Sequence, residues 1–401
     1  MNNRKHISFA VFITFIVTTV LYVGAYLYVP LFSGTLNNAA SFLKSADSGK
    51  IGDKIKEIDK YVDTYYMDDI DSEKLKNYAV KGYVSGLGDV YSEYYSKAEY
   101  EELNADLTGN YKGIGVEVAI DVDDLITVLA AYDGAPAAKG GIKKGDKIIK
   151  VNDTDVDASN YDEAVNMMRG AGDYGKTDDM ILTVKRGEKT FETKVTREKV
   201  ISQTVKSEML ESNIGYVNVS QFAEETDEDF EIQINSLISK GAKALIIDLR
   251  NNPGGMLTTV VNMADYLLPK GEILRIVGKD SEPMIYSSDE KCIDLPICVL
   301  INGNSASASE VLSGALKDHD RATLIGEKTY GKGVVQSIFD LDDGDALKIT
   351  TAKYYTPSGE CIDQKGIKPD INSKMELTKN LALYEKNEDT QLQRAIKELS
   401  K

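Results

Sequence analysis

Residues 297–301 form an uninterrupted apolar run that leads directly into a turn of small residues and then into a helix-like run at 308–316. This order constrains the fold most, because an apolar run joined to a helix by a short turn is typical of a buried strand in an α/β layer. Such a turn points backbone N–H groups and a hydroxyl outward. We therefore expect one of three serines in it, Ser305, Ser307 or Ser309, to be exposed and reactive.

The number of histidines limits which residue could be the base that activates such a serine. Serine is a preferred helix N-cap residue, so each of the three could serve as a cap, whereas a serine nucleophile needs a base, usually histidine. The chain has only two histidines, His6 and His319. His6 precedes an apolar N-terminal segment, and His319 follows Ser307 on the same predicted helix, about 18 Å away at 1.5 Å per residue. The sequence thus argues against a Ser-His-Asp triad.

Lysine is the remaining candidate base, and Lys332 stands between Gly331 and Gly333. Glycines on both sides allow the backbone to turn tightly and to approach another chain segment closely. Burial there would lower the lysine pKa and favour the neutral amine that a base requires. The alternative is a solvated lysine in a glycine turn.

Two motifs carry a family resemblance. Ser-Ala-Ser-Ala-Ser-Glu at 305–310 and Gly-Glu-Lys-Thr-Tyr-Gly-Lys-Gly-Val-Val-Gln at 326–336 resemble the C-terminal processing (tail-specific) peptidases, which use a Ser/Lys dyad. The resemblance implies that Ser307 is the nucleophile, Lys332 the base and Gln336 the residue that orients the lysine. An amide suits that role because it offers a donor and an acceptor without charge. No metal or organic cofactor is implied.

A second pattern resembles a PDZ domain, which we expect at 106–198. Residues 113–118 have the form of a carboxylate-binding loop that runs into an edge strand. Residues 134–152 resemble a second sequence segment that is typical of PDZ domains. Such a loop holds a terminal carboxylate with backbone N–H groups, while the ligand pairs with the strand edge. The expected groove residues are Gly113, Ile114, Gly115, Val116, Val165, Met168 and Arg169. Arg169 would either cap the preceding helix or sense an occupied groove.

The second half of the chain alternates apolar strand patterns with helical ones. A strand is expected at 214–219, a helix at 228–238, a strand at 242–249 and a helix at 256–268. The segment between the last two, Asp-Leu-Arg-Asn-Asn-Pro-Gly-Gly at 248–255, again resembles the peptidase family. The resemblance implies that an N–H group of Gly254 or Gly255 joins that of Ala308 in an oxyanion hole. A plain strand-to-helix turn is the alternative.

The N-terminal part predicts a membrane anchor. Residues 7–29 carry no charge, and a helix of that length spans about 35 Å, enough for a bilayer. Arg4 and Lys5 precede it, which places the remainder of the chain outside the cytoplasm. Cleavage after a signal-peptide-like Val-Gly-Ala at 23–25 is the alternative. Residues 51–100 carry helical spacing. Within them the stretch Leu-Gly-Asp-Val-Tyr-Ser-Glu-Tyr at 87–94 resembles one that precedes the PDZ domain in the family, and its tyrosines are expected to pack helices or to support a dimer.

The net charge bears on which partners the chain can bind, and the cysteine content bears on disulfide bonds and zinc binding. The net charge of −17 argues against nucleic acid or anionic lipid as the main partner. Three cysteines with no repeated spacing indicate neither a disulfide scaffold nor a zinc site. Cys298 is expected in the core, while a bridge from Cys292 to either Cys298 or Cys361 stays open.

Together these features predict a layered α/β peptidase core, similar to the ClpP and crotonase folds, with an inserted PDZ domain, an N-terminal helical region and one transmembrane helix. The expected function is a membrane-anchored serine endopeptidase that cuts proteins near apolar C-terminal tails, with the PDZ domain controlling access. A regulatory protein and a second copy of the chain are further expected partners. The alternative is a non-catalytic PDZ scaffold in the cell envelope. The expected segments are 1–30 (anchor), 31–48 (linker), 49–105 (helices), 106–198 (PDZ) and 199–401 (core).

Overall fold

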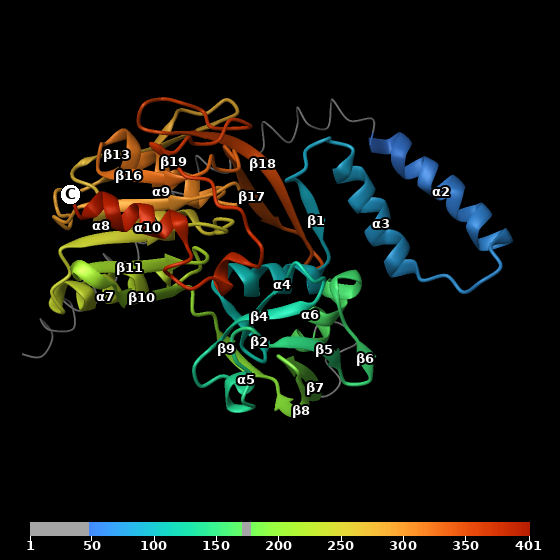
Figure 1. Cartoon of the computed structure of the whole chain (residues 1–401). Helices are drawn as coiled ribbons and strands as arrows, with labels where there is room; N and C mark the ends of the chain where they lie inside the picture. Colours follow the sequence, from blue (N-terminus) through green and yellow to red (C-terminus); the bar gives the residue numbers. More distant parts are fainter. Residues whose placement is uncertain (1–47, 171–177) are drawn as a thin grey trace, which may run out of the picture. The chain divides into compact units, whose positions relative to one another are not determined.

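The N-terminal described segment forms helices. The computed structural model describes residues 48–170 and 178–401 (Figure 1). The chain divides into two compact units, with the boundary in the sequence between Lys76 and Asn77. Helix α2 (Ser48–Tyr65) lies in the first unit, and α3 (Ser72–Ser85) begins there and ends in the second. Among the described helices none is long and apolar enough to cross a bilayer. The span expected at 7–29 lies outside the described residues.

An antiparallel sheet of five main strands forms the PDZ domain. Its strands lie in the order β3-β4-β5-β7-β8, with the short β6 beside β5, so that β3 is an edge strand. Alternating apolar residues and helix α6 fill its interior, including the fully buried Ile148 and Leu182. The elements are β3 (Val116–Ile120), β4 (Ile126–Ala131), α5 (Pro136–Lys139), β5 (Lys147–Val151), β6 (Thr154–Asp155), α6 (Tyr161–Arg169), β7 (Asp179–Arg186) and β8 (Lys189–Thr196).

A two-stranded ribbon flanks this domain in sequence. Helix α4 (Lys97–Thr108) ends at Gly109, which adopts a left-handed conformation with φ of 71° that favours glycine. Strand β2 (Asn110–Gly113) then pairs antiparallel with β9 (Glu198–Ile201). The chain therefore enters and leaves the PDZ domain through adjacent strands.

The peptidase core is built on a six-stranded sheet with the order β10-β11-β12-β15-β16-β19. All neighbouring pairs are parallel except β10 and β11. This mixed α/β sheet confirms the predicted fold class of the core, including the strand and helix around the serine turn. The elements are β10 (Val205–Met209), β11 (Ile214–Val219), α7 (Thr226–Ser239), β12 (Ala244–Asp248), α8 (Leu257–Leu267), β15 (Ile297–Ile301), α9 (Ala308–Asp318), β16 (Ala322–Gly326), β19 (Ile371–Asn372) and α10 (Thr390–Leu399).

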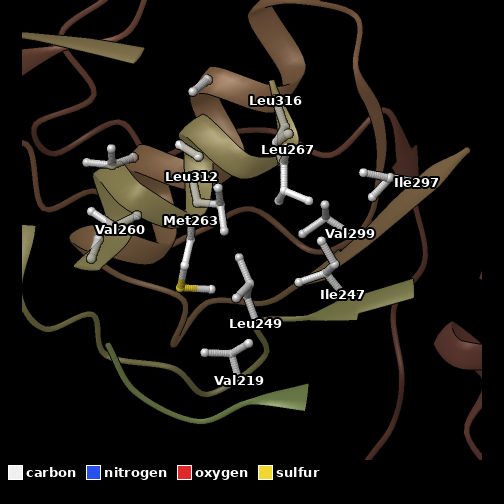
Figure 2. Close-up of a cluster of buried hydrophobic side chains, with 14 of the residues drawn as sticks. Val219, Ile247, Leu249, Val260, Met263, Leu267, Ile297, Val299, Leu312 and Leu316 are labelled. Atoms are coloured by element: carbon white, nitrogen blue, oxygen red, sulfur yellow. The ribbon is translucent and has the colours of Figure 1, made fainter. Parts of the chain in front are cut away.

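Side chains on the two faces of this sheet enter different cores. Ile247 and Val299 pack in the core cluster that includes the apolar residues of α7, α8 and α9, as Figure 2 shows for α8 and α9. The next residue back along each strand, Ile246 and Cys298, faces the opposite side with Leu392 of α10. Successive side chains of a strand point to opposite faces of the sheet. Because both faces are buried here, the strand sequences are continuous apolar runs. Burying one side chain of this size contributes about 1.5–3 kcal/mol.

A second sheet completes the core around β18 (Ala346–Tyr355). Strand β17 (Val334–Asp340) pairs along one edge of β18 (Figure 1), and the other edge is shared by β13 (Gly271–Gly278) and the short β1 (Glu93–Tyr95). Strand β14 (Met284–Ser288) pairs with β13. The tyrosines at 94–95 therefore lie in a strand and not in the predicted helix, because pairing with β18 outweighs the local helical spacing.

All three cysteines are free, with Cys298 in the core as predicted. Neither of the two bridges that the sequence left open is formed.

Candidate active site

Ser307 occupies the turn between β15 and α9 in a backbone conformation that few residues adopt. Its φ is 54° and its ψ is −116°, and it is the residue that precedes the first turn of α9. Positive φ in a residue that is not glycine costs about 1–3 kcal/mol and clusters at functional sites. The turn thus holds the Ser307 side chain at the N-terminal end of a buried helix.

The three serines of the turn differ in what their hydroxyls do. Ser305 donates to the carbonyl oxygen of Leu249 at 2.8 Å, and Ser309 donates to that of Asn252 at 2.9 Å; both serines are fully buried. Ser307 is half-buried, and its hydroxyl donates no hydrogen bond within the described residues. Of the three, Ser307 alone has a proton available to a base.

The Gly254–Gly255 turn lies against Ser307. A Cβ atom on Gly254 would stand 2.8 Å from the Ser307 Cβ and 3.0 Å from the Ala308 nitrogen, so no other residue fits there. The Gly254 N–H already donates to Asn252 Oδ1 at 2.9 Å. In the described part of the chain, the N–H groups of Gly255 and Ala308 have no hydrogen-bond acceptor. These two groups are therefore free to bind an oxygen anion.

Lys332 is half-buried in a loop fixed by its neighbouring glycines. A Cβ on Gly333 would lie 2.4 Å from the Asp363 nitrogen, which shows how closely the two segments approach. Burial lowers the pKa of the Lys332 amine, the positive charge of Lys348 lowers it further, and the charges of Asp89 and Glu310 oppose this. Its Nζ lies 4.7 Å from the centre of the Tyr91 ring. Among the described residues it makes no hydrogen bond to Ser307.

A buried carboxylate joins the serine turn to the lysine loop. Glu310 Oε2 accepts the N–H groups of Ser307 at 2.9 Å and Lys332 at 2.8 Å. Its Oε1 accepts the N–H of Gly331 at 2.7 Å and the hydroxyl of Thr329 at 2.6 Å. Burial raises the pKa of Glu310, and the four donated hydrogen bonds oppose that rise. The sequence analysis missed this residue, although Ser-x-x-Glu at a helix start is a recognisable capping pattern.

Tyr354 of β18 makes a second connection between the same two segments. Its buried hydroxyl contacts the carbonyl oxygen of Ser307 at 3.2 Å and that of Lys332. Burial raises the pKa of Tyr354 well above its ordinary value, so the hydroxyl keeps its proton and can donate. The backbones of Ser307 and Lys332 are thus both held by hydrogen bonds to the Glu310 carboxylate and to the Tyr354 hydroxyl.

Gln336 lies on β17, and its amide points to β18. Its Nε2 donates to Thr350 Oγ1 at 3.2 Å, and Thr350 in turn donates its N–H to Ser92 Oγ at 3.1 Å. No hydrogen bond joins Gln336 to Lys332 in the described residues. The Gln336 amide oxygen has no donor there and is available to the lysine.

Arg250, which the sequence analysis did not single out, connects the segment after β12 to the start of the C-terminal helix α10. Its guanidinium is 2% exposed and pairs with Asp248 at 2.6 Å and with Asp389, the N-cap residue of α10, at 2.7 Å. Tyr216 donates to Asp248 at 2.7 Å. A buried charge that is paired on both sides holds its surroundings in one geometry, and removing one partner is costly.

Six of the seven predicted PDZ groove residues line one cavity of about 200 Å³: Ile114, Gly115, Val116, Val165, Met168 and Arg169. Gly113 lies in β2 instead, where a Cβ would meet the Tyr111 ring. Arg169 pairs with Asp106 at 2.8 Å and lies 5.4 Å from the centre of the Tyr111 ring. Its contacts are therefore with α4 and β2.

Comparison with known proteins agrees with these features. Residues 213–373 match the model of peptidase family S41, and residues 104–185 match that of the PDZ domain. A probable CtpA-like serine protease of Staphylococcus aureus (strain COL) is 36% identical over 362 residues, which cover 89% of this chain and 70% of that protein. The carboxy-terminal processing protease CtpA of Bacillus subtilis (strain 168) is 35% identical over 345 residues, covering 85% and 73%. A solved photosystem II D1 C-terminal processing protease is 28% identical with a TM-score of 0.50, covering 80% of this chain and 86% of that one.

Proposed function

This chain belongs to peptidase family S41 and is a serine-type C-terminal processing peptidase, and we propose that it cuts proteins near their C-termini with a Ser307–Lys332 dyad. The observation that carries the dyad is the Glu310 carboxylate, which accepts the N–H groups of both residues through one oxygen. Membership of a peptidase family leaves the alternative of a non-catalytic scaffold without support.

The proposed reaction begins with a neutral Lys332 amine. The lysine side chain turns from Tyr91 towards Ser307 and accepts the hydroxyl proton, while the serine oxygen attacks the carbonyl carbon of the scissile bond. The oxygen of that carbonyl becomes negative and accepts the free N–H groups of Gly255 and Ala308. Gly254 serves by making room, since its own N–H is already used by Asn252.

The second half of the reaction returns the protons. The Lys332 ammonium donates to the amine of the leaving fragment, and the C–N bond breaks to leave an acyl ester on Ser307. Lys332 then takes a proton from water, which attacks the ester carbonyl carbon. The C–O bond to Ser307 breaks, the Lys332 ammonium returns its proton to the Ser307 oxygen, and the second product leaves as the acid. In this proposal Gln336 orients the lysine, and its amide oxygen accepts a hydrogen bond from Nζ.

The PDZ groove is proposed to capture the apolar tail of the substrate. The exposed edge of β3 offers backbone groups for an added strand, and Val165 and Met168 line the cavity beside it. Arg169 is proposed to sense the tail carboxylate. To do so it would have to exchange its ion pair with Asp106 for the substrate.

Cleavage of an unfolded reporter protein tests this function. The full chain should cut near the C-terminus of a reporter with an apolar tail, also in EDTA, and much more slowly when the tail ends in charged residues. Val165→Asp should reduce kcat/KM for the tailed reporter about tenfold, or about 1.4 kcal/mol, because a carboxylate then occupies the apolar groove. Ile181→Asp, on an exposed PDZ position outside the groove, should leave it unchanged. Cuts spread evenly along the reporter would contradict tail selection.

Membrane anchoring through residues 7–29, with the catalytic part outside the cytoplasm, is proposed from the sequence alone. Protease treatment of intact cells would degrade an external domain and spare an internal one.

A homodimer is also proposed, because α2 exposes Ile51, Ile55 and Ile58 at helical spacing. Light scattering that gives the mass of one chain would exclude it. A regulatory protein acting on substrate access completes the proposed partners.

A further inference from the structure

A turn far away in sequence forms one wall around the Lys332 amine. Tyr91 precedes β1 and lies about 240 positions before Lys332, yet its ring faces Nζ at 4.7 Å. Tyr330, in the segment that leads to the lysine, is a close enough neighbour to raise the pKa of Tyr91, after burial, which raises it most. A cation over the face of an aromatic ring is attracted by the negative potential of that face, more strongly when water is excluded. This contact therefore favours the ammonium form of the lysine.

The same turn is fixed by a carboxylate. Asp89 accepts the N–H of Tyr91 at 3.2 Å and the hydroxyl of Ser92, and Ser92 Oγ accepts the N–H of Thr350 at 3.1 Å. Pairing of β1 with β18, which joins Glu93 to Lys348, continues this attachment. The turn is thus part of the peptidase core sheet, although it precedes the PDZ domain in the sequence.

Asp89 carries a negative charge towards the lysine. Burial alone would raise the pKa of Asp89, but the hydrogen bonds from Ser92, Thr350 and the Tyr91 N–H, together with the charge of Lys332, hold it below its ordinary value. The other charged groups that face Lys332 are Glu310 on α9 and Lys348 on β18. Lys348 has the opposite sign from Asp89 and acts against it. Tyr330 and Asp363 face the Tyr91 side of the turn.

We propose that Asp89 and Tyr91 are positioning residues that hold the ammonium form of Lys332 in the free enzyme, before the proposed dyad reaction, on which this inference rests, begins. The lysine acts as the base of that reaction after this ammonium has lost a proton and the neutral amine has turned towards Ser307. The Tyr91 ring contacts Nζ at 4.7 Å, and the negative charge of Asp89, on the same turn, favours the ammonium. In the resting enzyme the same two groups keep the lysine against Tyr91 and apart from Ser307.

The pH dependence of kcat/KM tests this inference, because its acid limb reports the base of the free enzyme. The full chain would be compared with Asp89→Asn, Tyr91→Leu, Tyr91→Phe and Lys348→Gln. Asp89→Asn and Tyr91→Leu should move the acid limb to lower pH, by about one unit for the charge, because the ammonium loses a stabilising neighbour. Lys348→Gln should move it to higher pH, because a repelling charge is gone. Tyr91→Phe keeps the ring and should leave the limb in place.

These opposite directions distinguish positioning from folding. A purely structural turn would lower activity or the melting temperature in Asp89→Asn and Tyr91→Leu without moving the limb, and that result would overturn the inference. So would wild-type profiles in both variants. If the acid limb of the kcat/KM profile stayed in place in Lys332→Ala, the proposed dyad itself would be wrong. If the limb disappeared in Lys332→Ala but did not move in Asp89→Asn, the dyad would stand and the role of Asp89 would be wrong.

Discussion

Replacing Ser307 with alanine is expected to reduce kcat/KM at least about a thousandfold, with no loss of folding stability. The hydroxyl is half-buried and donates no hydrogen bond among the described residues, so its removal leaves no protein acceptor unsatisfied. The positive φ of residue 307 remains, and alanine tolerates it no worse than serine. Reporter cleavage and thermal unfolding of the purified variant measure the two quantities.

The neighbouring serines supply matched controls. Ser305→Ala and Ser309→Ala each remove a buried hydrogen bond to a backbone carbonyl, so each should destabilise the fold by about 1 kcal/mol and retain cleavage. Lys332→Ala should lose about 10²–10⁴-fold, the usual range for a general base, whereas Lys328→Ala on the exposed side of the same segment should not. Cleavage that survives in Ser307→Ala but disappears in Ser309→Ala would show that the wrong serine was chosen.

Local patterns were sufficient to predict the strand, turn and helix around the serine. The apolar run at 297–301 is long enough for a strand and too short for a helix, and small residues follow it at once. Its central position in a parallel sheet explains why both faces are apolar, since Val299 faces α8 and α9 while Cys298 faces α10. The family resemblance also singled out Gly254 and Gly255 but left open which N–H would be free, and only the folded structure shows that the Gly254 N–H donates to Asn252.

The surroundings of Lys332 were not predictable, for a physical reason. Tyr91 and Asp89 reach the lysine only because β1 pairs with β18, and no local propensity indicates which distant strand a three-residue segment will join. The same holds for Tyr354, whose hydroxyl is buried against the backbone carbonyl oxygens of Ser307 and Lys332, which lie on other segments. Arg250 and Asp389 are 139 positions apart and likewise meet only in the folded core.

Replacing Glu310 with glutamine should lower both the catalytic activity and the free energy of unfolding, and by more than a substitution on the surface would. The glutamine has the same shape, but one end becomes an NH₂ group that faces two N–H donors instead of accepting them. If that end replaces Oε2, the backbone N–H groups of Ser307 and Lys332 both lose their acceptor. A hydrogen bond to a charged group contributes about 1.5–3 kcal/mol, so the two together predict a loss of about 3–6 kcal/mol in unfolding free energy.

The effect on catalysis should be separable from the effect on folding. At a temperature where the Glu310→Gln variant is fully folded, kcat should still fall by about a hundredfold, because a displacement near 1 Å between nucleophile and base is enough for such a loss. Binding of the tail in the PDZ groove does not involve Glu310, so KM should change little. Glu360→Gln, an exposed carboxylate paired only with Lys365, is the matched control and should alter neither quantity. A folded Glu310→Gln variant with wild-type kcat would mean that the carboxylate holds the helix start alone and not the geometry of Ser307 and Lys332.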